Sequence, residues 1–164
     1  MINRRQLLKN AVMGIAGAVA FPEVIFASNI IQGSFTERII QAESNGNPKA
    51  YRKDTHARGL MQITPIVRYE WNNFHPERKI GKHDLYNPKI NVKVGEWYLF
   101  ERILGHYLPH YKLDLHEPNA LASWNIGPPT HAGVYGDAIK NFKELPGETK
   151  EFIKKVTGKV YSNP

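Results

Sequence analysis

Carboxylate chemistry is the reaction type that the sequence favours, and Glu43 is the residue best placed for it. Glu43 follows the apolar residues Ile39, Ile40 and Ala42, and we expect it at the C-terminal end of a helix over 34–43. The negative end of a helix dipole and partial burial both disfavour an ionised carboxylate, so both are expected to raise the pKa of Glu43. A carboxylic acid that keeps its proton near neutral pH can protonate a leaving oxygen, as cleavage of a glycosidic bond requires.

Other kinds of catalytic or metal site find less support in the chain. It has no cysteine, which excludes disulfides, cysteine-ligated zinc, iron–sulfur clusters and cysteine nucleophiles. It also lacks the Gly-x-Ser-x-Gly turn of serine hydrolases and a glycine-rich loop that ends in Gly-Lys-Ser/Thr. His106 and His110 have the spacing of a helical metal pair, but we expect Pro109 to break that register. His116-Glu117 starts like a zinc-protease motif but lacks the second histidine, so we expect no metal and no cofactor.

Four groups of residues resemble the motifs of one enzyme family, in that family's order. They are Glu43-Ser44 with Asn47-Pro48 and Gly59–Pro65 (GLMQITP); Asn87-Pro88 with Asn91, Gly95 and Tyr98-Leu99; Ala120–Pro128 (ALASWNIGP); and Glu148–Ile153 (ETKEFI). Together these segments, which run from about Phe35 to Val156, resemble the soluble lytic transglycosylases. Those proteins are bacterial cell-wall enzymes of glycoside hydrolase family 23.

This resemblance implies a mainly α-helical fold, a small lysozyme-like domain with an active-site cleft. It also implies cleavage of the β-1,4 bond between N-acetylmuramic acid and N-acetylglucosamine in the glycan strands of peptidoglycan. In that family a single glutamate acts first as acid and then as base, and Glu43 is the residue that matches it. The 6-hydroxyl of the muramic sugar would attack C1 and leave a 1,6-anhydro end, so no second carboxylate is needed.

The resemblance further implies a set of substrate-binding side chains along the cleft: Met61, Gln62, Trp124, Asn125 and Phe152. Gln62 offers both donors and acceptors to a sugar, and Met61 offers a soft apolar contact. Asn125 can bond an N-acetyl group or Glu43 itself. A core methionine and two loop-capping amides remain alternative roles for these three residues. Gly59 is expected where the backbone turns tightly.

Three positions depart from the family's pattern. Trp124 and Phe152 both stand where the family has tyrosine; Trp124 keeps a stacking face, whereas Phe152 has lost the hydroxyl. The loop Tyr51–Arg58 lacks the serine that many members carry before Gly-Leu-Met-Gln. The loss of the tyrosine hydroxyl and of the serine keeps one rival function open, a catalytically weakened peptidoglycan-binding component of a secretion or conjugation machine. A hydrolytic goose-type lysozyme, with the same fold and the same acid, is the other rival.

Helices joined by loops that contain Gly and Pro are expected to position these residues. After the helix over 34–43, we expect one that follows Thr64-Pro65 and a long one from Asn87, its cap, to Pro109. Two further helices are expected over about 118–124 and over 148–161. Residues 44–59 and 125–147 are predicted to be irregular. The sequence shows no internal repeat and no second domain.

The first 27 residues are interpreted as an export signal, and 28–164 as the catalytic domain. A basic head with Asn3–Lys9 (NRRQLLK) resembles a twin-arginine signal, and a short apolar run follows over Ala11–Phe21. An uncleaved N-terminal membrane anchor is the alternative. The net charge of +7 comes from scattered basic residues, which disfavours nucleic acid and suits an anionic polymer of the cell envelope. We therefore expect a periplasmic protein whose partners are peptidoglycan strands and possible secretion or conjugation machinery.

Overall fold

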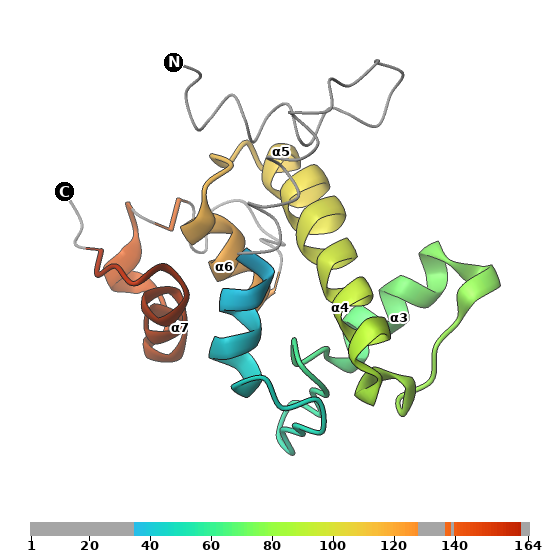
Figure 1. Cartoon of the computed structure of the whole chain (residues 1–164). Coiled ribbons are helices and arrows are strands. Elements are labelled where there is room, and N and C mark those ends of the chain that lie inside the picture. The colour runs from blue at the N-terminus through green and yellow to red at the C-terminus, as the bar shows by residue number, and fades with distance from the viewer. Residues whose placement is uncertain (1–34, 128–136, 139, 162–164) are drawn as a thin grey trace, which may run out of the picture. The chain divides into compact units, whose positions relative to one another are not determined.

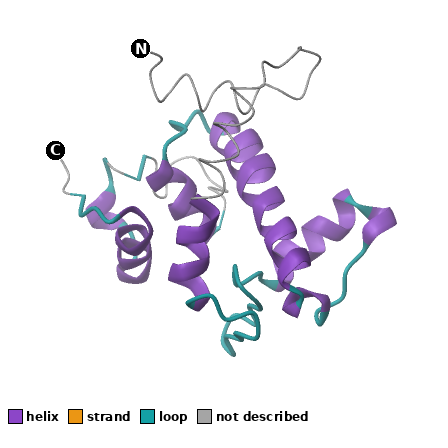
Figure 2. Ribbon diagram, in the orientation of Figure 1, coloured by secondary structure: helices purple, strands orange, loops and turns teal. Residues whose placement is uncertain are grey.

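The structure, a computed structural model, describes residues 35–127, 137–138 and 140–161, and in these ranges the chain is helical with no strand (Figures 1 and 2). The isolated bridges of Tyr51 with Arg58 and of Arg58 with Ile63 are the strand-like pairings within those ranges. The mainly α-helical fold expected from the sequence is therefore confirmed. Across the same ranges, no helix is long and apolar enough to cross a membrane. The chain divides into two compact units, Thr36–Tyr98 and the remainder.

The unit Thr36–Tyr98 contains the N-terminal part of the described chain. Its elements are the helix over 35–44 from its second residue on, then α3 (Pro65–Phe74), the short helices η1 (Pro76–Arg78) and η2 (Asp84–Tyr86), and α4 (Pro88–Glu96). Thr64 and Asn87 cap α3 and α4: each side chain accepts backbone N–H groups of the first turn, and a proline follows each cap. The sequence predictions for both helix starts are confirmed.

Aromatic rings of α3 pack against Trp97, the residue that follows α4. The rings of Trp71 and Trp97 meet edge to face, with their centroids 5.3 Å apart. The His75 ring stacks on Trp71 at 3.8 Å, and the Trp71 indole N–H donates to the carbonyl of Arg78. Both tryptophans are buried. This packing holds α3 against η1 and against the residue that follows α4.

The other unit contains the C-terminal helices. The long helix continues from α4 into a π-helical stretch, Trp97–Tyr107, and a last turn, α5 (Leu108–His110). Then come α6 (Glu117–Ile126), η4 (Phe142–Glu144) and α7 (Gly147–Thr157). α6 packs against α7, and Leu121, Ile153 and Val156 are buried in this unit. α6 carries two of the predicted site residues and α7 carries a third.

Two boundary predictions are wrong. Pro109 does not end the long helix, which continues to His110 through the π-helical stretch. Pro109 lies in the first turn of α5, directly after the π-helical stretch, and a proline is tolerated in the first turn of a helix. The rings of His106 and His110 lie side by side, with centroids 5.9 Å apart, so Pro109 does not separate them as expected. The last helix ends at Thr157 because Gly158 adopts a left-handed conformation, with a φ of 68°, that terminates it.

Candidate active site

Glu43 lies where the sequence predicted it, in the last turn of the helix over 35–44, and it is half-buried. Two side chains attach this helix to the rest of its unit. Near its start, the Thr36 hydroxyl donates to the carboxylate of Glu96 at 3.0 Å. At its end, the Ser44 hydroxyl donates to the carbonyl of Leu60 at 2.7 Å. Glu43 therefore belongs to a helix that is held at both ends, and its neighbour Ser44 is bonded to the segment Gly59–Gln62, called the GLMQ turn from here on.

Gly59 is required by the shape of the GLMQ turn. Its φ is +78°, a left-handed conformation that side chains rarely adopt. A Cβ atom at this position would overlap the side chain of Asn91 and the carbonyl of Leu85. The tight turn expected at Gly59 is confirmed, and glycine is required both by the backbone angle and by the close approach of η2 and α4.

Met61 and Gln62 face the interior of their unit. Met61 is fully buried, with its sulfur against Gly95 of α4, so a side chain on Gly95 would overlap it. The Gln62 amide nitrogen donates to the carbonyl of Gly59 at 2.9 Å and closes the turn on itself. The carbonyl oxygen of the Gln62 amide is not used in that bond. Contact of either side chain with a sugar stays a prediction.

Asn91 has a structural role that the sequence motif does not predict. The sequence places it in a helix motif, and the structure shows a fully buried amide that binds three backbone groups. Its oxygen accepts the N–H of Met61, and its nitrogen donates to the carbonyls of Arg58 and Leu85, all at 2.8 Å. An asparagine four positions after the Asn87 cap, on the buried face of an amphipathic helix, was the available signal. A buried amide needs partners, and on that face they lie outside its own helix.

The remaining predicted site residues belong to the other unit. Trp124 and Asn125 lie on the last turns of α6, and both are half-buried. Phe152 is buried on α7, which packs against α6. The hydroxyl of Thr149, one turn before Phe152, donates to the side-chain oxygen of Asn125 at 2.7 Å. The structure thus groups Glu43, Met61 and Gln62 in one unit and these three residues in the other.

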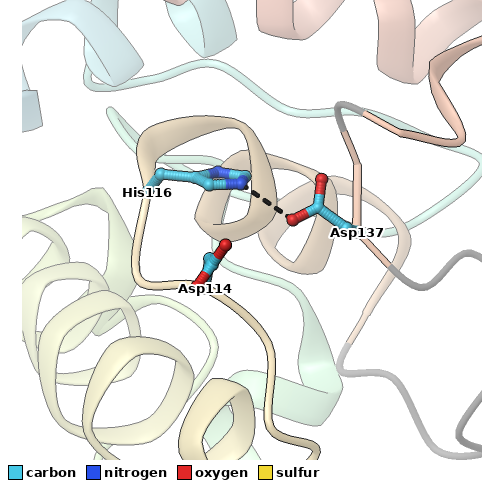
Figure 3. A group of neighbouring side chains, drawn as sticks. All are labelled: Asp114, His116 and Asp137. Atoms are coloured by element: carbon cyan, nitrogen blue, oxygen red, sulfur yellow. Dashed lines mark hydrogen bonds and ion pairs between the residues drawn. The ribbon is translucent and has the colours of Figure 1, made fainter. Parts of the chain in front are cut away.

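Asp114, His116 and Asp137 form a cluster whose possible ligand atoms all lie within 4.8 Å of one another (Figure 3). His116 is the N-cap of α6, and its Nδ1 accepts the backbone N–H of Asn119 at 3.2 Å. This bond places the ring proton on Nε2, which donates to the carboxylate of Asp137 at 3.2 Å. Because a metal would need the lone pair of Nε2, these hydrogen bonds favour a helix cap over a metal ligand.

The described chain is a small, mainly helical domain in which Glu43 lies at a helix end and its neighbour Ser44 is hydrogen-bonded to the GLMQ turn. A protein-family model described as Transglycosylase SLT domain matches residues 28–144, and the chain belongs to this family. The family indicated by the sequence motifs is therefore confirmed.

One similar solved structure is the crystal structure of the 70 kDa soluble lytic transglycosylase SLT70 from Escherichia coli. The TM-score is 0.58 at 22% sequence identity, and the match covers 95% of this chain and 23% of that one. This chain thus spans about a quarter of that protein's length, and the likeness shows a shared fold. No curated protein sequence matches the chain at the significance required.

Proposed function

We propose that this protein is a peptidoglycan lytic transglycosylase, a lyase that cleaves the β-1,4 bond between N-acetylmuramic acid and N-acetylglucosamine. The observation that carries the proposal is the placement of Glu43. It is a half-buried carboxyl group at the C-terminal end of a helix, and the next residue, Ser44, is hydrogen-bonded to the GLMQ turn. The helix terminus and partial burial favour the protonated acid that the first step needs. Family membership supports the same activity.

The proposed reaction uses Glu43 twice. Protonated Glu43 gives its proton to the bridging oxygen as the bond from that oxygen to C1 of the muramic sugar breaks. The carbonyl oxygen of the 2-acetamido group stabilises the positive charge at C1. The Glu43 carboxylate then takes the proton of the 6-hydroxyl, whose oxygen bonds to C1. Glu43 ends protonated as it began, the product is a 1,6-anhydro sugar, and no water is consumed.

The other predicted site residues are assigned to substrate binding. The oxygen of the Gln62 amide, which the bond from its nitrogen to Gly59 leaves unused, accepts a hydrogen bond from a sugar hydroxyl. Met61 is fully buried, so its part in substrate binding is to support the turn that carries Gln62. Trp124 and Phe152 offer apolar ring surface to the sugars, and Asn125 bonds an N-acetyl group.

The cellular setting is part of the proposal. Residues 1–27, which lie outside the described residues, direct export to the periplasm, where the domain 28–164 meets peptidoglycan. There it opens the wall locally for a secretion or conjugation apparatus. A membrane contact follows if the signal remains uncleaved. A fusion of residues 1–27 to a reporter that is active when exported tests this part; a reporter retained in the cytoplasm contradicts it.

Product analysis tests the activity itself. Purified peptidoglycan is digested with the protein in ¹⁸O-labelled water, and the fragments are analysed by mass spectrometry. We expect 1,6-anhydro ends without ¹⁸O. Reducing ends that carry ¹⁸O would instead establish a hydrolytic lysozyme, and binding without cleavage would establish a weakened wall-binding component. Glu43→Gln should bind peptidoglycan without cleaving it. Glu37→Gln, an exposed position on the same helix, is the matched control and should cleave normally.

A further inference from the structure

Thr149 and Asn125 form a buried link between α7 and α6. Thr149 is the third residue of α7 and is 1% exposed. Its hydroxyl lies 2.7 Å from the side-chain oxygen of Asn125, which is 24 positions earlier on α6. It is the one hydrogen bond that the described residues show for the side chain of Asn125. Thr149 is therefore placed to control how the Asn125 amide is oriented.

The buried hydroxyl of Thr149 must have a hydrogen-bond acceptor, and this requirement determines which group donates in the bond to Asn125. A threonine within a helix commonly donates its proton to the carbonyl four residues before it, as Thr157 does to Ile153 at 2.8 Å in the same helix. Thr149 makes no such bond in the described chain, and its hydroxyl partner is Asn125. A buried O–H without an acceptor is costly. Thr149 therefore donates, and the group that it binds on Asn125 is the carbonyl oxygen.

An amide whose oxygen is bound in this way presents its NH₂ group, which can only donate. Asn125 is half-buried, so a ligand can reach it. We propose that Thr149 is a positioning residue that holds Asn125 as a hydrogen-bond donor, and that Asn125 binds the carbonyl oxygen of an N-acetyl group on the glycan strand. This inference rests on the proposed function, because it takes peptidoglycan as the ligand.

The acetamido carbonyl is the acceptor that this arrangement selects. Sugar hydroxyls both donate and accept, so a fixed amide would not distinguish them from other partners. An amide carbonyl can only accept, and it accepts from an NH₂ group but not from a second carbonyl. Fixing the orientation before binding removes the cost of ordering the Asn125 side chain when substrate arrives. The same mechanism would reject a ligand that lacks the acetyl group.

The experiment measures binding rather than turnover. Glycan strands, either N-acetylated or chemically de-N-acetylated, are titrated into Glu43→Gln protein, which keeps the strands intact. We expect Thr149→Val to weaken binding of acetylated strands about 10-fold, the equivalent of one lost hydrogen bond, and Thr149→Ser to restore it. Asn125→Asp should bind as poorly as Asn125→Ala, because a carboxylate offers no donor. Thr157→Val, the matched control on α7, should bind normally.

Double variants separate a positioning role from a structural one. Thr149→Val should have no further effect on binding when Asn125 is already alanine. Neither Asn125→Ala nor the double variant should discriminate between acetylated and de-N-acetylated strands. Full binding by Asn125→Asp would show that the outward group is an acceptor and would overturn the inference. Equal effects of Thr149→Val with and without Asn125 would also overturn it. Because no bond is cleaved in this assay, a failure here is distinct from a failure of Glu43 to act as the acid.

Discussion

The side-chain oxygen of Asn91 accepts the backbone N–H of Met61 at 2.8 Å, across 30 positions of sequence. The amide nitrogen of the same side chain donates to the carbonyls of Arg58 and Leu85. Because Asn91 is fully buried, water cannot replace these bonds. One amide on α4 therefore determines the position of the GLMQ turn, to which the helix of Glu43 is attached through Ser44.

Asn91→Asp tests this arrangement. The carboxylate keeps an acceptor for Met61, but its second oxygen faces the carbonyls of Arg58 and Leu85 in place of a donor. We expect a loss of about 3 kcal/mol in the free energy of unfolding at neutral pH, measured with urea. Asn73→Asp, at an exposed position on α3, is the control and should change it little. Equal stability of the two variants would contradict the assigned role of Asn91.

The pH dependence of the Asn91→Asp variant gives a second check. Burial against two carbonyls raises the pKa of the introduced carboxyl above its value in the unfolded chain. The loss of unfolding free energy is therefore fully present when the pH is above the pKa of this carboxyl in the folded protein. It disappears as the pH falls below the pKa of the carboxyl in the unfolded chain. The difference in unfolding free energy from the wild type should shrink on acidification. A difference that is constant with pH would show that ionisation is not its cause.

Gly95→Ala should disturb the same turn from the other side. A Cβ atom on Gly95 would overlap the sulfur of Met61, which is fully buried and cannot move aside freely. We expect a loss of about 1–3 kcal/mol, seen as a lower melting temperature. Gly147→Ala, where a Cβ would meet nothing within 4 Å, is the control. The effect should nearly vanish when Met61 is also changed to Ala, and if it persists, the overlap is not the cause.

Local signals were enough to predict the helix starts and the place of Glu43. A capping side chain followed by proline fixes the first turns of α3 and α4, and the cap depends only on neighbouring residues. The end of α7 could have been predicted as well, because Gly158 is a common helix terminator. The π-helical stretch before Pro109, and the extra residue of helix after it, could not, since no local propensity signals a π-helix.

The supports of the candidate site depend on pairings that sequence spacing does not reveal. Asn91 binds residues 6, 30 and 33 positions away, and Thr149 binds Asn125 across 24 positions. Each of these polar residues lies on a helix, where an exposed role was equally consistent with its type. The resemblance to a family identified Glu43, the GLMQ turn and Asn125. The contacts that orient them became visible once the helices were packed.

Ser44→Ala should affect activity more than stability. The change removes the hydrogen bond from the Ser44 hydroxyl to the carbonyl of Leu60 and so loosens Glu43 against the GLMQ turn. We expect a cost of about 1 kcal/mol in unfolding free energy. The rate of release of 1,6-anhydro fragments should fall about 10-fold, because a small displacement of the acid is costly in the transition state. Thr157→Val removes a comparable hydroxyl bond within α7 and should leave that rate unchanged.

The cluster of Asp114, His116 and Asp137 should respond to substitution as a helix cap. His116→Ala removes the acceptor for the Asn119 N–H and the donor to Asp137, so we expect a loss of about 1 kcal/mol in unfolding free energy. His116→Asn should lose less, because asparagine is itself a good N-cap. Added Zn²⁺ should leave the melting temperature of the wild type unchanged, since Nε2 carries the proton that Asp137 accepts. A rise in melting temperature with Zn²⁺ that His116→Asn abolishes would instead establish a metal site, and the cap would then be a feature of the metal-free protein alone.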